Sequence, residues 1–175
     1  MKTRLSHLIV LFAVATVGFA AEAPKTFTMS AEIPFDPDVA GDLGMLAAPN
    51  GNAEVIKAQC NLSKSLGGYI AHAARDKKFQ VTSVANPEGA SGPVLRVSIE
   101  GVMGYMGVAR GPKVLTVRGE LRDGEIVIGS FVAREETHEF FRDDCKGFNA
   151  TAISAALDIA KWLQAPKLKA RLGAA

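Results

Sequence analysis

Five stretches of the chain alternate between apolar and polar residues, which is typical of β-strands with one buried face. They are TFTMSAEIPF, FQVTSV, VLRVSIEGV, KVLTVRGEL and EIVIGSFVA. The last three follow one another closely, and Asp123-Gly124 between the final two is a strong signal for a tight hairpin. We therefore expect them to form an antiparallel meander. EIVIGSFVA has apolar residues on both faces, which favours a central or covered position in the sheet.

Two longer stretches carry apolar residues at every third or fourth position, the spacing of an amphipathic helix. The first runs roughly from Glu54 to Lys78 and the second from Asp143 to Gln164. Gly67 and Gly68 would each destabilise the first helix by about 1 kcal/mol relative to Ala. We therefore expect these glycines to allow close packing on a neighbouring element.

The predicted order is β-α-β-β-β-α when the short FQVTSV segment is left aside. This order predicts a single α+β domain, with a mostly antiparallel sheet and both helices on one face, because that arrangement buries every apolar row. The expected domain covers residues 21–165. Residues 166–175 are expected to form a short, basic and frayed C-terminal tail.

The N-terminus has the layout of a secretory signal peptide, in which basic residues precede a short apolar run and a small-residue cleavage site. Lys2 and Arg4 precede Leu8–Ala20, which is shorter than the roughly 20 residues of a membrane-spanning helix. We expect residues 1–20 to be removed after Ala20 and the mature protein to be periplasmic. An uncleaved N-terminal anchor is the less favoured alternative.

Removal of Lys2 and Arg4 would leave 18 basic residues against 18 acidic ones. A balanced charge argues against nucleic acid as a partner, because nucleic-acid binding requires a basic face. We expect no cofactor and no nucleic acid.

The chain has two cysteines, Cys60 and Cys145, the second within FFRDDCKGF. In an oxidising compartment such a pair most often forms a disulfide. Two free structural thiols, or a reactive or metal-bound Cys145, are the alternatives. One geometric objection remains, because both cysteines lie early in their helices and a simple sheet of this order would make those helices antiparallel. The disulfide then requires a non-helical stretch before Leu62 or a less simple topology.

The stretch GVMGYMG has glycine at every third residue, interleaved with large apolar side chains. A hairpin tip or a bulged strand end is the simplest interpretation. Met and Tyr side chains on such a loop also make an adaptable contact surface, so Met103, Tyr105 and Met106 are the candidate partner contacts. A metal site would have to gather His72, His138, Asp143, Asp144 and a cysteine, and we expect none because no metal-ligand spacing is present.

The signal peptide, the element order and the closing helix CKGFNATAISAALDIAKWL together resemble small exported bacterial envelope proteins. The architecture is similar to the N-terminal domain of the translocation protein TolB. It is also similar to outer-membrane-associated lipoproteins of polysaccharide export and peptidoglycan-synthase activation. The resemblance implies a binding or scaffolding role in the envelope with another envelope protein as partner. The chain departs from these lipoproteins because it lacks a lipid-accepting cysteine after the apolar run.

The expected function is therefore that of a non-enzymatic interaction or assembly module. The alternative is a small periplasmic hydrolase or thiol enzyme that uses Cys145 as nucleophile and His138 as base.

Overall fold

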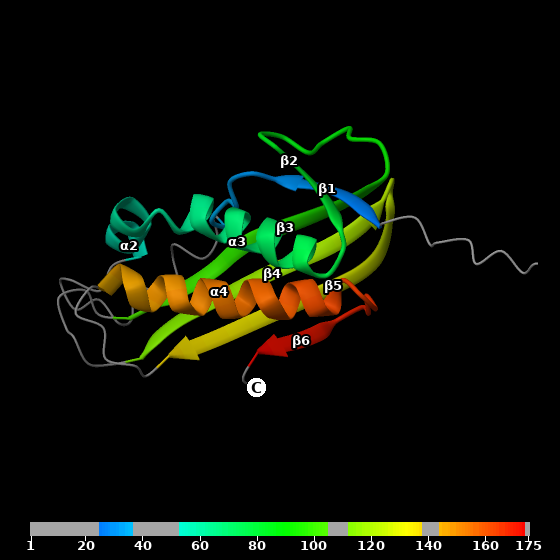
Figure 1. Ribbon diagram of the computed structural model, residues 1–175. Coiled ribbons are helices and arrows are strands. Elements are labelled where there is room, and N and C mark those ends of the chain that lie inside the picture. The colour runs from blue at the N-terminus through cyan, green and yellow to red at the C-terminus, as the bar shows by residue number, and fades with distance from the viewer. Residues whose placement is uncertain (1–24, 37–52, 105–111, 138–143, 174–175) are drawn as a thin grey trace, which may run out of the picture.

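The computed structural model describes residues 25–36, 53–104, 112–137 and 144–173. The strands are β1 (Thr26–Ser30), β2 (Gln80–Val84), β3 (Pro93–Met103), β4 (Lys113–Asp123), β5 (Ile126–Thr137) and β6 (Ala170–Gly173). The helices are α2 (Ala53–Cys60), α3 (Leu62–Asp76) and α4 (Asp144–Trp162) (Figure 1). The predicted signal peptide lies outside the described residues.

The six strands form one sheet in the order β2-β1-β3-β4-β5-β6. The long pairings β3–β4 and β4–β5 are antiparallel, whereas the shorter pairings of β1 with β2 and β3, and of β5 with β6, are parallel. The hairpin at Asp123-Gly124 is present, and Gly124 adopts the positive φ that such a turn needs. The α+β class is confirmed, and the order broadly matches the prediction. The FQVTSV segment forms β2, and β6 is an additional strand.

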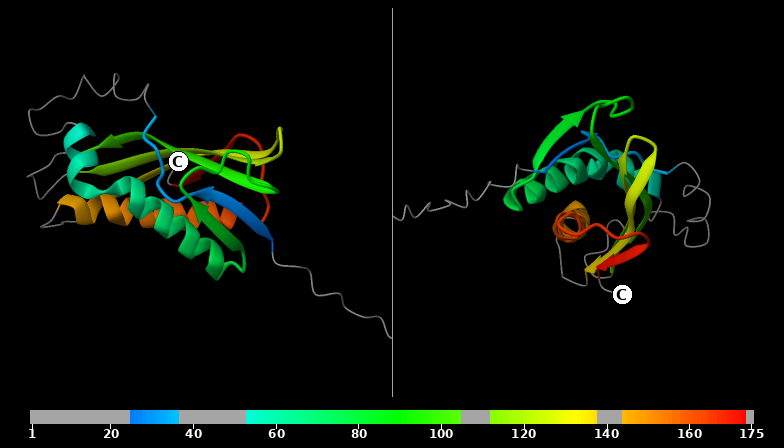
Figure 2. Two further views of the ribbon diagram at one scale, coloured as in Figure 1. Left: turned by 90° about the horizontal axis from the view of Figure 1, so that it is seen from above. Right: turned by 90° about the vertical axis from the view of Figure 1, so that its right-hand side faces the viewer.

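Helices α3 and α4 pack on one face of the sheet (Figure 2). The apolar rows of the predicted strands and helices form one continuous core between the two layers. Its largest fully buried side chains are Phe131, Phe148, Met29, Ile33, Ile56, Leu62, Leu66, Ile70, Leu95, Ile99, Leu115 and Ile159. Burial of this apolar surface is the main stabilising contribution to the fold.

The first predicted helix is interrupted at Asn61, which adopts the left-handed conformation between α2 and α3. Asn tolerates that conformation better than most residues. Ile56 and Cys60 of α2 are buried, whereas Ala58 is exposed.

The expectation of a frayed C-terminal tail is wrong. Ala170–Gly173 forms β6, which pairs in parallel with Phe131–Arg134 of β5. Trp162 helps to hold the connection, because its indole N–H donates to the carbonyl oxygen of Lys167 at 3.2 Å. Four residues at the end of a polar segment give almost no periodic signal, and for that reason the sequence did not reveal this strand.

The direction of the helices also differs from the expectation. Strand β1 lies between β2 and β3 and is parallel to both, so β1, β3 and β5 all run the same way. Helices α3 and α4 consequently run in the same direction, side by side (Figure 1). Their N-terminal ends meet at one end of the molecule, which we call the disulfide end.

Candidate functional site

The disulfide end is closed by a bond between Cys60 and Cys145, whose Cα atoms are 5.1 Å apart. Cys60 is the last residue of α2, and Cys145 lies in the first turn of α4. The parallel course of the two helices removes the geometric objection, since it brings both N-terminal ends together. The predicted pairing is present. The sulfur of Cys145 is bonded, so it could act as a nucleophile only after reduction.

Met103, one of the predicted partner contacts, is half-buried in the last position of β3. The strand pairing shifts register between Ile99 and Gly101, so β3 has an irregularity directly before the GVMGYMG stretch. Gly104 follows, and a Cβ atom there would lie 2.8 Å from Cδ of Lys113 and 2.9 Å from Cζ of Phe148. The chain therefore needs glycine to pass this point. Tyr105 and Met106 lie outside the described residues.

The candidate metal ligands are not brought together within the described part of the chain. No group of three or more His, Cys, Asp or Glu residues there is placed to hold a metal ion. His72 lies exposed on α3 with Nε2 3.8 Å from a carboxylate oxygen of Asp76. His138 and Asp143 lie outside the described residues. The described helices also include none that is long and apolar enough to cross a membrane.

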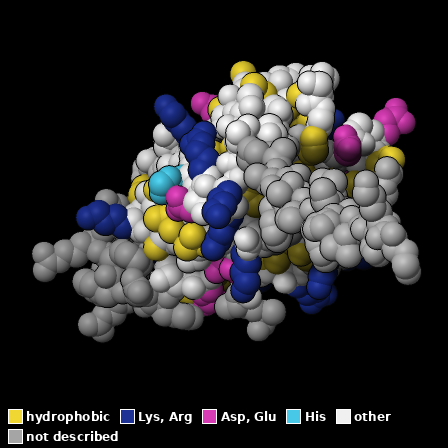
Figure 3. Space-filling model, turned by 45° about the vertical axis from the view of Figure 1, so that its right-hand side comes forward, with side chains coloured by type: hydrophobic (Ala, Val, Ile, Leu, Met, Phe, Trp, Pro, Cys, Tyr) yellow, Lys and Arg dark blue, Asp and Glu magenta, His cyan; other side chains and the backbone are white. Residues whose placement is uncertain are grey.

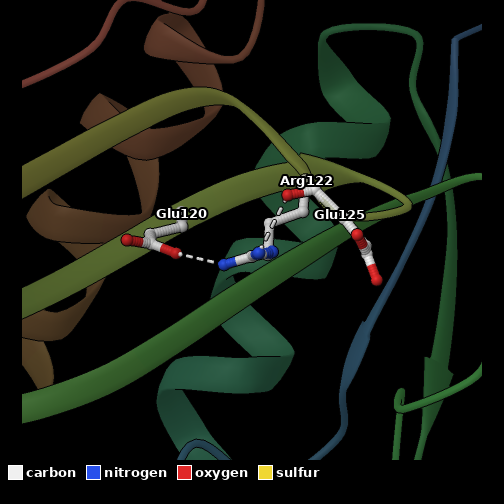
Figure 4. A network of polar contacts seen from close by, with 3 residues as sticks. All are labelled: Glu120, Arg122 and Glu125. Atoms are coloured by element: carbon white, nitrogen blue, oxygen red, sulfur yellow. Dashed lines mark hydrogen bonds and ion pairs between the residues drawn. The ribbon is translucent and has the colours of Figure 1, made fainter.

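The face of the sheet opposite the helices carries polar side chains, and we call it the open face. Arg122 Nη1 donates to Glu120 at 3.1 Å, and Arg122 Nη2 donates to the carbonyl oxygen of Glu125 at 3.0 Å (Figure 4). Arg118 Nε donates to Glu100 on the neighbouring strand. These contacts satisfy the charges of β3 and β4 at the surface, where each exposed pair contributes only about 0–1 kcal/mol to stability.

A cavity of about 560 Å³ lies on the open face between β4, β5 and β6, and we call it the basic hollow. Its charged lining residues are Arg118, Glu120, Arg134, Lys169 and Arg171. Sequence reasoning missed this site because two of its basic residues belong to the tail that was not expected to be a strand. The alternation of KVLTVRGEL did indicate that Arg118 faces away from the core, whereas Arg134 follows the predicted strand EIVIGSFVA and had no such signal.

A buried carboxyl group is a second feature that the sequence did not reveal. Glu135 of β5 is only 8% exposed, and its Oε1 atom has no hydrogen-bond partner among the described residues. Burial, followed by the charge of Asp158 and a hydrogen bond with it, raises the pKa of Glu135 to about 7. Gly173 covers this carboxyl group, since a Cβ atom there would collide with Oε1 of Glu135 and with the carbonyl oxygen of Arg134.

Because the folded-state pKa of Glu135 is raised above its usual value of 4.5, the folded protein binds more protons than the unfolded chain between these two values. We therefore predict that the free energy of unfolding falls as the pH rises from about 4.5 to about 7. After allowance for solvent screening, the loss should be roughly 2 kcal/mol.

Glu135→Gln should remove this pH dependence and be the more stable protein at pH 8, because the amide stays neutral and can donate to Asp158. Urea unfolding at pH 5 and pH 8 measures both effects. Glu88→Gln, at an exposed loop position, is the control and should keep the wild-type profile. A wild-type protein equally stable at both pH values would show that Glu135 does not titrate in this range.

No family model matches the chain, and no curated protein matches it. Several solved structures are similar to it. A crystal structure of an uncharacterized protein aligns with a TM-score of 0.51 and 12% identity, over 80% of this chain and 92% of the other. A PelC dodecamer from Paraburkholderia phytofirmans aligns with a TM-score of 0.45 and 16% identity, over 78% of this chain and 85% of the other. A lipoprotein from Neisseria meningitidis aligns with a TM-score of 0.40 and 13% identity, over 79% of this chain and 99% of the other.

At these identities the likeness concerns the fold, and none of these structures indicates a specific role for this chain. The resemblance to TolB stays a prediction.

Proposed function

We propose that the protein is an exported, non-enzymatic interaction or assembly module of the bacterial cell envelope. It would bind another envelope protein through the segment that contains Met103, Tyr105 and Met106. The observation that carries the proposal is that the described residues on both sides of this segment pack on α4 near the disulfide.

The described residues on both sides of the segment are held by α4. Gly104 packs against Phe148, and Lys113 lies over the same ring, with Nζ 5.7 Å from its centroid. Phe148 is fully buried and lies one helical turn after Cys145. The disulfide and the core therefore hold Gly104 and Lys113, the residues that flank the segment, in place. Binding residues are often found on loops that a rigid scaffold positions in this way.

The chemistry of the segment suits protein recognition. Methionine side chains adapt to irregular apolar surfaces, and tyrosine is enriched at protein interfaces. The sheet itself would act as the support.

We expect a photo-crosslinking amino acid at position 105 of the exported protein to give a discrete adduct with one envelope protein in cells. The same amino acid at position 83, an exposed site on β2, is the control and should give no such adduct. Mass spectrometry identifies the captured protein, which is then purified. It should bind the wild type at least about tenfold more tightly than it binds the double variant Tyr105→Ser, Met106→Ser. The reason is that the loss of buried aromatic and methionine contacts costs more than about 1.4 kcal/mol of binding free energy.

The variant should melt at the wild-type temperature, which a thermal melt checks. Equal affinity of the variant and the wild type, or identical adducts from positions 105 and 83, would refute the proposed contact surface.

A further inference from the structure

The charges of the basic hollow are not balanced by the acidic residues around it. Arg118 is paired with Glu100, and Glu120 is paired with Arg122. Within the described part of the chain, no acidic side chain forms an ion pair with Arg134, Lys169 or Arg171. The hollow therefore presents three uncompensated positive charges to solvent.

Backbone pairing holds Arg134 and Arg171 close to each other and to Arg118. Val132 of β5 pairs with Arg118 of β4 on one side and with Arg171 of β6 on the other, and Arg134 pairs with Gly173. Adjacent strands lie about 4.8 Å apart. Arg118 of β4 and Arg171 of β6 are therefore separated by the width of one intervening strand, β5. Arginine in such an arrangement can bind a phosphate group through two parallel hydrogen bonds.

The loop before β6 is fixed to β5 as well. Ser130 N donates to the carbonyl oxygen of Lys167 at 3.0 Å, and Lys169 N donates to Ser130 Oγ at 2.9 Å. Leu168 lies between these two lysines and is 61% exposed. Ile128, two residues before Ser130, is 42% exposed. Large apolar side chains therefore stand in solvent directly beside the basic hollow.

A surface that combines exposed Leu or Ile with Lys and Arg is complementary to a bilayer that contains anionic lipid. The apolar side chains enter the boundary between headgroups and acyl chains, and the basic ones bind the phosphates. An acidic peptide would use the same charges but would leave Leu168 and Ile128 without a function. Lipid is therefore the favoured occupant.

We propose that the open face docks on the surface of a bilayer containing anionic phospholipid, with a lipid phosphate group in the basic hollow and Leu168 in the acyl boundary. This contact is separate from the proposed protein contact at the disulfide end. A single molecule could thus bind a membrane through the open face and a protein partner through the Met103 segment.

The test uses the protein recovered after export, with its N-terminus established by mass spectrometry, and measures co-sedimentation with vesicles. Vesicles of phosphatidylcholine with 30 mol% phosphatidylglycerol, roughly the anionic content to which basic surface patches respond, are compared with vesicles of phosphatidylcholine alone. We expect binding to the anionic vesicles only, and weaker binding as salt is raised.

The double variant Arg134→Gln, Arg171→Gln should bind the anionic vesicles about 30-fold more weakly, given the contribution of each basic residue near a charged bilayer. Leu168→Ser should weaken binding roughly tenfold through lost apolar burial. The control is Lys64→Gln, Arg75→Gln, which removes the same charge from exposed positions on α3. Basic side chains gather on the face shown in Figure 3 as well, so this control separates a specific site from a general effect of net charge.

Three results would overturn the proposal. The first is that the wild type does not bind anionic vesicles. The second is that the control variant loses as much vesicle binding as the double variant. The third is that the protein binds glycerol phosphate but does not bind the vesicles. The circular dichroism spectrum and melting temperature of each variant establish that it is folded. None of these results depends on position 105, so the proposal fails or stands independently of the proposed protein partner.

Discussion

Loss of the disulfide between Cys60 and Cys145 is expected to lower the melting temperature by roughly 10 to 15 °C. A domain of this size shows a shift of that order when its free energy of unfolding falls by about 4 to 5 kcal/mol. The bond joins residues separated by 85 positions, so it removes much of the conformational freedom of the unfolded chain. The chain-entropy relation gives about 4 to 5 kcal/mol for a loop of this length. The variant Cys60→Ala, Cys145→Ala should show this loss in a thermal melt.

Reducing agent provides the matched control. It should shift the melt of the wild type toward that of the double variant and leave the double variant unchanged. Thiol titration of the denatured, unreduced wild type should find no free thiol. Two reactive thiols per chain would contradict the disulfide and keep open the alternative in which Cys145 is a nucleophile. An unchanged melting temperature after verified reduction would show that the bond does not stabilise the fold.

Gly67→Ala is expected to destabilise the protein by about 3 kcal/mol, the upper part of the range for overpacked sites. Gly67 is buried in α3, and a Cβ atom there would collide with the carbonyl oxygen of Ala31. That atom belongs to the backbone, so α3 would have to move away from the chain that follows β1. The movement would also stretch two hydrogen bonds, from Ser63 Oγ to the Ile33 carbonyl oxygen at 2.6 Å and from Ile33 N to the Ser63 carbonyl oxygen at 3.0 Å.

Gly68→Ala is the control and should act in the opposite direction. Gly68 is exposed, and a Cβ atom there would meet nothing within 4 Å. Alanine should stabilise the helix by about 0.5 to 1 kcal/mol, because it loses less conformational entropy than glycine. Urea unfolding of both variants measures the difference. Equal effects at the two positions would mean that α3 does not pack closely on residue 31.

Gly67 and Gly68 show which part of the helix packing could be predicted from the sequence. Their position in a helical pattern indicated close packing, and the structure confirms it for Gly67 only. Consecutive residues of a helix point in directions about 100° apart. Gly67 therefore faces the backbone of Ala31, while Gly68 faces solvent. Similarly, the presence of two cysteines in a chain expected to be exported predicted the disulfide, but the direction of the helices could not be derived from the sequence.

The sequence by itself determined the elements whose pattern repeats over many residues: the rows of β3, β4 and β5, the buried face of α4 and most of that of α3. Such periods arise from the geometry of the local backbone, so neighbours along the chain are enough to define them. Only the tertiary structure decided that β1 lies between β2 and β3, that Ala170–Gly173 is a strand, and that Glu135 is buried under it. These features depend on contacts between segments far apart in sequence. Their free energies come from packing and desolvation in the folded molecule, and a local pattern does not contain them.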